Sequence, residues 1–306
     1  MKISTKEHLL RWFKILKRTF LLFLFGVILN ISNSKFIFWK PFRIPGVLQR
    51  ISICFFVITS IHILIENIYL QCLSISLMQF VYLFGMFMID VPNYKNKICG
   101  KGIITAECSG SGYIDRLIFS SGFLYQWSPT DPEGILSTLS AFTTTYFGLL
   151  YFHISKKFKN DSYKKLTYWL SLGVVLIVIG SIIDSNWFPF NKNIYSTSFA
   201  LFTSGLCGIF LSIFSIIMDE FQFHYFLIIF VWIGRNPFIM YFLPAMVNSL
   251  FFQIRYNKQT LKHLIYNYSF GRFGGVGGSF LYSSAFLGIW VILSFIMDYK
   301  KIYIKL

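Results

Sequence analysis

The sequence predicts an all-α fold, a polytopic integral membrane helical bundle with about eight transmembrane helices. Hydrophobic residues make up 55% of the 306 residues and charged residues only 13%, whereas a soluble domain carries about 25% charged residues. Apolar stretches of about 20 residues, long enough to cross a bilayer, recur along the chain. The net charge of +16 lies mostly at the ends of these stretches, which indicates a membrane surface and no nucleic-acid partner.

Eight apolar segments predict the eight spans. They are 15–31, 47–68, 70–90, 134–154, 164–183, 195–218, 223–250 and 278–297. The second helix should start at Pro45, whose fixed φ and missing N–H suit a first helical turn. The fourth should start with Asp131 as its N-cap and Pro132 in the first turn. Small residues such as Gly173 and Gly205 predict close helix packing.

The distribution of Lys and Arg predicts the orientation, because short cytosolic segments are enriched in both. Residues 1–18 hold six and 155–165 hold five, whereas the short loop at 184–194 holds only Lys192. With an even number of spans, both termini should be cytosolic. The loops expected on the lumenal or extracellular side are 32–46, 91–133, 184–194 and 251–277.

Two modifications are expected in the lumenal loops. Cys99 and Cys108 share the longest polar loop, and in an oxidising lumen such a pair should form a disulfide. Asn267 opens the sequon Asn267-Tyr-Ser269, far enough from the membrane to be glycosylated.

Four lumenal segments concentrate polar residues. Their carboxylates, arginines and asparagine amides could orient a substrate, accept a proton or donate hydrogen bonds. Structural alternatives are a helix cap at Asp131, an ion pair between Asp115 and Arg116, and a turn at Asn191. The candidates are Arg43, Gln49, Arg50, Asp115, Arg116, Asp131, Glu133, Asn191, Lys192 and Asn193. The histidines show no metal-ligand spacing, so no metal is predicted.

Several distinctive motifs occur in order along the chain. They are Arg43-Ile-Pro-Gly-Val-Leu-Gln-Arg50, Gly112-Tyr-Ile-Asp-Arg116, Leu124-Tyr-Gln126, Asp131-Pro-Glu-Gly-Ile-Leu136, and Pro189-Phe-Asn-Lys-Asn193 followed by Ser196. In this order they resemble motifs of the heparan-α-glucosaminide N-acetyltransferase family. The resemblance covers about residues 8–306. Asn236 also matches a residue of a family helix and is a further candidate. Tyr195 differs from the family, which commonly has tryptophan at this position.

The resemblance implies transfer of acetyl from cytosolic acetyl-CoA to the amino group of a terminal glucosamine of heparan sulfate, across the lysosomal membrane. It also implies a lumenal histidine as acetyl acceptor or base. Residues 1–306 would form a single transmembrane acyltransferase-like domain that matches the later eight helices of the family. The chain would then be a fragment truncated on the amino-terminal side, without the first three family helices and without that histidine. The alternative is a non-catalytic transporter-like or scaffold membrane protein of the same fold.

The implied co-substrate, acetyl-CoA, carries phosphates that clustered cations would attract. The alternative for these cations is attraction to anionic lipid headgroups. The candidates are Arg11, Lys14, Arg18, Lys164, Lys165, Lys300 and Lys301. Expected partners are membrane lipid and the glucosamine terminus of heparan sulfate, with a homodimer as one option for assembly.

Overall fold

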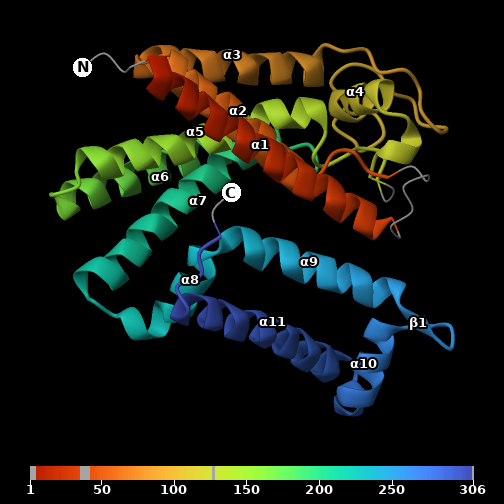
Figure 1. The fold of residues 1–306 in the computed structure, drawn as a ribbon. Helices are drawn as coiled ribbons and strands as arrows, with labels where there is room; N and C mark the ends of the chain where they lie inside the picture. Colours follow the sequence, from red (N-terminus) through yellow and green to blue (C-terminus); the bar gives the residue numbers. More distant parts are fainter. Residues whose placement is uncertain (1–4, 35–41, 126–127, 305–306) are drawn as a thin grey trace. The chain divides into compact units, whose positions relative to one another are not determined.

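A computed structural model of the chain describes residues 5–34, 42–125 and 128–304. It confirms the all-α polytopic membrane fold (Figure 1). Within the described residues, seven helices are long and apolar enough to cross a membrane, or eight if a bent pair counts as one span. The described residues fall into two compact units, the first within 1–26 and 41–221 and the second within 27–40 and 222–306. That the chain acts as one transmembrane domain stays a prediction.

The helices up to residue 221 account for most of the predicted spans. Their bounds are α1 Thr5–Asn33, α2 Val47–Leu64, α3 Ile68–Phe87, the short α4 Gly110–Ile118 with the 3₁₀ turn Ser121–Phe123, α5 Ile135–Lys157, α6 Ser162–Asn186, and α7 Thr197–Ser215 with a π-helical turn at Ile216–Glu220. Several begin where a short polar side chain accepts an early N–H. Asn67, Ser109, Asp161 and Ser196 cap α3, α4, α6 and α7 in this way, which satisfies donors that a helix start leaves open.

The packing of α6 on α7 confirms the role expected of the small residues. A Cβ on Gly173 would lie 2.9 Å from the Gly205 carbonyl oxygen, so only glycine lets the two backbones approach this closely. Hydrogen bonds then tie α5 to both helices: the Tyr151 hydroxyl donates to the Ser204 carbonyl (3.1 Å), and the Trp169 indole donates to the Tyr151 carbonyl (3.0 Å).

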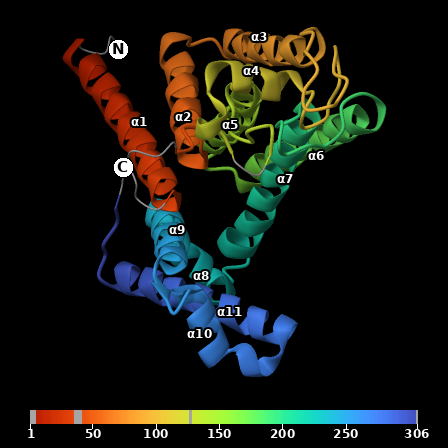
Figure 2. The ribbon, with the colours of Figure 1, turned by 90° about the vertical axis from the view of Figure 1, so that its right-hand side faces the viewer.

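The polar connections gather at one end of the first unit (Figures 1 and 2). At that end Leu136, at the start of α5, lies against Gly85 near the end of α3. At the other end, the rings of His62 and His153 are 4.8 Å apart, where α2 and α5 end. The segment after α3 contains a Cys99–Cys108 disulfide, whose Cα atoms are 5.1 Å apart.

The second unit contains α8 His224–Arg235, α9 Pro237–Gln253, the strands β1 Arg255–Tyr256 and β2 Gln259–Thr260, α10 Leu261–Ser269, a 3₁₀ turn Gly271–Phe273 and α11 Gly275–Tyr299. The two strands pair as an antiparallel hairpin. Asn267 lies exposed on α10.

The expectation of one continuous helix over 223–250 is wrong, because α8 and α9 meet at 85°. Pro237 lacks an N–H and disfavours the helical conformation in the residue before it, and Asn236 has φ −131°. The buried Asn236 amide donates to the Ile302 carbonyl (3.0 Å) and accepts the Ile304 N–H (2.9 Å). The break is therefore held by the segment that follows α11.

We expect Ser162 and Lys101 to be accessible from opposite sides of the membrane. Lys101 follows the end of α3, which lies beside the start of α5, whereas Ser162 follows the far end of α5. Single cysteines would be placed at each in a background without Cys72 and Cys207, and treated with an impermeant maleimide in sealed vesicles with the cytosolic face outward. Ser162→Cys should label at once and Lys101→Cys only after permeabilisation. Labelling of Ser162→Cys from the lumen alone would reverse the orientation.

Candidate functional site

A turn at Asp131–Gly134 is the centre of a polar cluster at one end of the first unit. Arg43 donates from Nε to Asp131 Oδ2 (2.9 Å) and from Nη2 to Asp131 Oδ1 (2.5 Å), and Nη2 also pairs with Glu133. Asp131 is fully buried, whereas the Arg43 side chain keeps 21% exposure. Burial acts to lower the pKa of Arg43, but the hydrogen bonds and charges of Asp131 and Glu133 outweigh it and raise that pKa. The guanidinium is thus a fixed cation.

The predicted helix start at Asp131 is wrong, because α5 begins at Ile135 with Gly134 as its N-cap. Asp131 instead accepts the N–H groups of Tyr125 (2.9 Å) and Glu133 (3.0 Å). Both carboxylate oxygens of Asp131 are therefore already hydrogen-bonded, and Asp131 stabilises its own turn and does not cap α5. The start predicted at Pro45 is two residues early, since α2 begins at Val47.

Asp115, reaching over from α4, accepts the first N–H of α5. Its Oδ1 takes the Ile135 N–H at 2.9 Å, which places a carboxyl at the positive end of a helix dipole. The side chain is fully buried, and Oδ2 has no partner among the described residues. Burial, with a smaller contribution from the charge of Asp131, raises the pKa of Asp115 to about 7 against the lowering effect of the Ile135 N–H.

Arg50 enters the cluster from the first turn of α2. Its Nη2 donates to the Pro132 carbonyl and to Ser137 Oγ, both at 2.5 Å. The Tyr195 ring stacks on the guanidinium at 5.1 Å. Tyr195 has φ +52°, a conformation that costs a non-glycine residue free energy and often marks a functional site. Neither Tyr195 nor Ser137 was among the predicted site residues, since no local pattern in the sequence links either of them to Arg50.

The Asp115–Arg116 ion pair considered as an alternative is not formed among the described residues. Arg116 donates instead to the carbonyls of Pro129 and Glu107, each at 2.9 Å, and its guanidinium lies 4.3 Å from the Tyr94 ring centroid. Burial lowers the pKa of Arg116. Arg116 therefore stabilises the loop around the cluster.

The remaining candidates have other surroundings. Gln49 is buried against Gly26 of α1, with Nε2 unpartnered among the described residues. Asn191 accepts the Asn193 N–H (2.9 Å) in a turn, and the side chains of Lys192 and Asn193 are exposed. Gln126 lies outside the described residues. Asn236 belongs to the second unit, where its amide is bound to main chain. Its grouping with the other candidates stays a prediction.

The cations proposed for CoA fall in both units. Arg11, Lys14 and Arg18 are exposed on successive turns of α1, and Arg18 lies 4.6 Å from the Phe55 ring centroid. Lys164 pairs with Asp161 at 2.9 Å and Lys165 with Asp219 at 3.6 Å. Lys300 and Lys301 are exposed in the second unit.

A groove of about 420 Å³ follows α3, α5 and α7 within the first unit. Its walls are mostly apolar, while Gln79 donates to Thr197 Oγ1 (2.5 Å) and accepts from Thr143 (2.9 Å). The groove runs along α3 from Cys72 to Leu83 and includes Thr197 at the start of α7.

The fold and this cluster define a polytopic membrane protein with a buried charged site at one end of its helices. This chain is similar to the human heparan-alpha-glucosaminide N-acetyltransferase, with 26% identity over 96% of this chain and 49% of the length of the human protein. The mouse protein of the same name is 28% identical over 61% of this chain and 35% of its own length. No family profile matches the chain. These matches confirm the resemblance, and the chain spans about half the length of the human relative.

We predict that Gly134→Ala destabilises the protein by about 1–3 kcal/mol, because a Cβ there would overlap the Asp115 carboxylate. Gly148→Ala on α5 is the matched control, since nothing lies within 4 Å of its Cβ position. The measurement is unfolding in mixed detergent. In an Asp115→Ala background Gly134→Ala should cost little, and an unchanged cost there would contradict the explanation.

Asp115 also predicts a pH dependence of stability. Its pKa is raised on folding from 3.8 to about 7, so between these pH values the folded state holds a proton that the unfolded state loses. The contribution of this carboxyl to the free energy of unfolding is therefore complete below pH 3.8 and is lost as pH rises to about 7. Roughly three pH units at 1.36 kcal/mol each give on the order of 4 kcal/mol. Asn mimics the protonated carboxyl, so Asp115→Asn should gain on wild type between pH 4.5 and 7.5 in thermal unfolding. Parallel curves would contradict the assignment.

Proposed function

We propose that these residues form the membrane part of an acetyltransferase that moves acetyl from cytosolic acetyl-CoA to the amino group of a terminal glucosamine of heparan sulfate in the lysosomal lumen. The observation that carries the proposal is the pairing of Arg43 with the fully buried Asp131 and with Glu133, formed by motifs that resemble those of the family. The two relatives bear the name of that activity.

The cluster suits acyl transfer because its donors are fixed before substrate arrives. Arg43 is held by two carboxylates and Arg50 by a carbonyl and a hydroxyl, so neither has to reorganise as negative charge develops on the carbonyl oxygen. Asp131 and Glu133 are occupied by Arg43. Asp115 has an unpartnered oxygen and a pKa of about 7, which makes it the carboxyl of this chain best suited to accept the proton of an amine.

The apolar groove suits the pantetheine arm of acetyl-CoA, which would bring the thioester toward the cluster through a low-dielectric passage. The phosphates would then bind the cations in the first half of α1, where Arg11, Lys14 and Arg18 recur at helical spacing. Anionic lipid headgroups are the competing ligand of these cations.

A non-catalytic, transporter-like protein is the second candidate. The broken pair α8–α9, with its 85° bend, is the feature that favours it, because discontinuous helices are common in transporters. Acetyl transfer and solute flux separate the two candidates.

The test is acetyl transfer to glucosamine in sealed vesicles by the full-length product of the gene, with labelled acetyl-CoA on the cytosolic side. Arg43→Lys should lower transfer at least about 10-fold, since lysine cannot bind two carboxylates in the same fork. Arg255→Lys, the same change at an exposed site, is the control. Wild-type vesicles that transport glucosamine without acetylating it would favour the transporter, and full transfer by Arg43→Lys would remove the cluster from the mechanism.

A further inference from the structure

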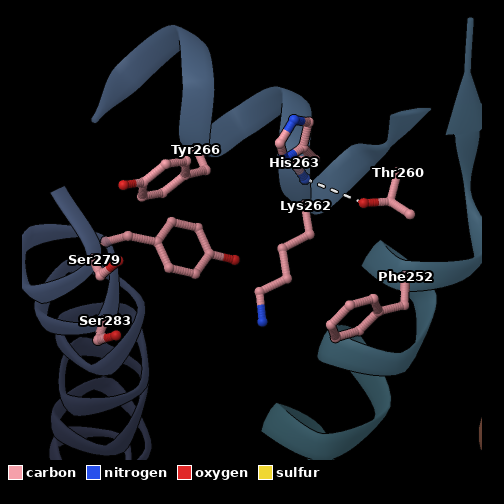
Figure 3. A pocket seen from close by; sticks show the side chains of 8 residues that line it. Phe252, Thr260, Lys262, His263, Tyr266, Ser279 and Ser283 are labelled. Atoms are coloured by element: carbon pink, nitrogen blue, oxygen red, sulfur yellow. Dashed lines mark hydrogen bonds between the residues drawn. The ribbon is translucent and has the colours of Figure 1, made fainter. Parts of the chain in front are cut away.

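The second unit contains a pocket of about 380 Å³ that the proposed acetyl transfer does not use. It is formed by the end of α9, the start of α10 and the first turns of α11. Figure 3 shows Lys262 extending into the space between α11 and Phe252 of α9. The other lining residues are Thr260, His263, Tyr266, Ser279, Tyr282 and Ser283.

Lys262 carries a charge that no carboxylate of this part of the chain compensates. Residues 236–297 contain no Asp or Glu, while 251–277 contain four Lys and Arg. The ammonium lies 4.5 Å from the Phe252 ring centroid and 5.8 Å from that of Tyr282, and it donates to Asn248 Oδ1 at 3.4 Å. Cation–π contacts hold the ammonium in place without neutralising its charge.

Side chains with hydroxyl groups line the same pocket. The Tyr282 hydroxyl is buried and has no partner among the described residues. Ser279 and Ser283 lie one turn apart on α11 and line the pocket (Figure 3), and the Ser279 hydroxyl donates to the Gly275 carbonyl (2.7 Å). The start of α10, capped by Thr260, adds the positive end of a helix dipole. A lysine, several hydroxyls and a helix start together favour an oxyanion with several acceptor oxygens.

The position of the pocket at the ends of α9 and α11 indicates the source of that oxyanion. Phe252 lies in the last turn of α9, which is long and apolar enough to span the membrane only together with α8. Ser279 and Ser283 lie in the first turns of α11, which is a candidate span by itself. Side chains at the ends of spans lie beside the lipid headgroups. We propose that the Lys262 pocket binds a phosphate group, and that its source is the headgroup of an anionic phospholipid.

The test measures binding of dioctanoyl phosphatidic acid to the purified full chain in neutral detergent by native mass spectrometry. Lys262→Met should weaken binding at least about 10-fold, the loss expected for a charge-assisted hydrogen bond, and Tyr282→Phe should weaken it less. Lys258→Met is the matched control, since Lys258 is exposed in the same loop. Each variant would first be checked for wild-type helicity and elution volume, and Tyr282→Phe carries the test if Lys262→Met does not fold.

Radiolabelled inorganic phosphate in equilibrium dialysis distinguishes the two sources. Weak phosphate binding beside tight phosphatidic acid binding, both dependent on Lys262, supports the lipid headgroup. Equal affinity for the two would keep the oxyanion site and overturn the lipid as its source. Unchanged phosphatidic acid binding by both Lys262→Met and Tyr282→Phe would overturn the site.

Discussion

The burial of the Asp131 carboxylate is the constraint on which the candidate site depends. A fully buried charge is costly unless it is paired and hydrogen-bonded, and Asp131 meets both conditions through Arg43 and two main-chain N–H groups. Because Arg43 precedes α2 and Asp131 precedes α5, this one pair sets how the two helices begin. It also leaves Glu133 and the Pro132 carbonyl facing the two arginines.

The start of α5 follows from the same turn. With Asp131 used inside its own turn, the first N–H of the helix is satisfied from a distance by Asp115, and Gly134 must lack a side chain to admit that carboxyl. Burial then raises the pKa of Asp115 to about 7. The burial that accompanies the capping of α5 therefore also brings the pKa of this carboxyl close to neutral pH.

Features set by local sequence could be predicted, whereas contacts between residues far apart in the chain could not. The spans follow from apolar length, and the packing of Gly173 on Gly205 from residue size, so both could be predicted. The break at Asn236 had a local signal in Pro237, but the apolar run on both sides outweighed it. The capping of α5 by Asp115 connects residues 20 apart, and the stacking of Tyr195 on Arg50 depends on tertiary packing. No spacing rule could have found either contact.

A double-mutant cycle on Arg43→Met and Asp131→Asn tests the central claim most directly, with unfolding free energy in mixed detergent as the measured quantity. If the pair organises the site, Arg43→Met should lose about 3–5 kcal/mol, because it leaves the buried Asp131 carboxylate without its cation. Asp131→Asn should lose less, because Arg43 keeps its pair with Glu133. The double variant should then lose much less than the sum, with a coupling energy of at least about 1.5 kcal/mol. Additive losses within about 0.5 kcal/mol would show that the two residues act independently and would contradict the account.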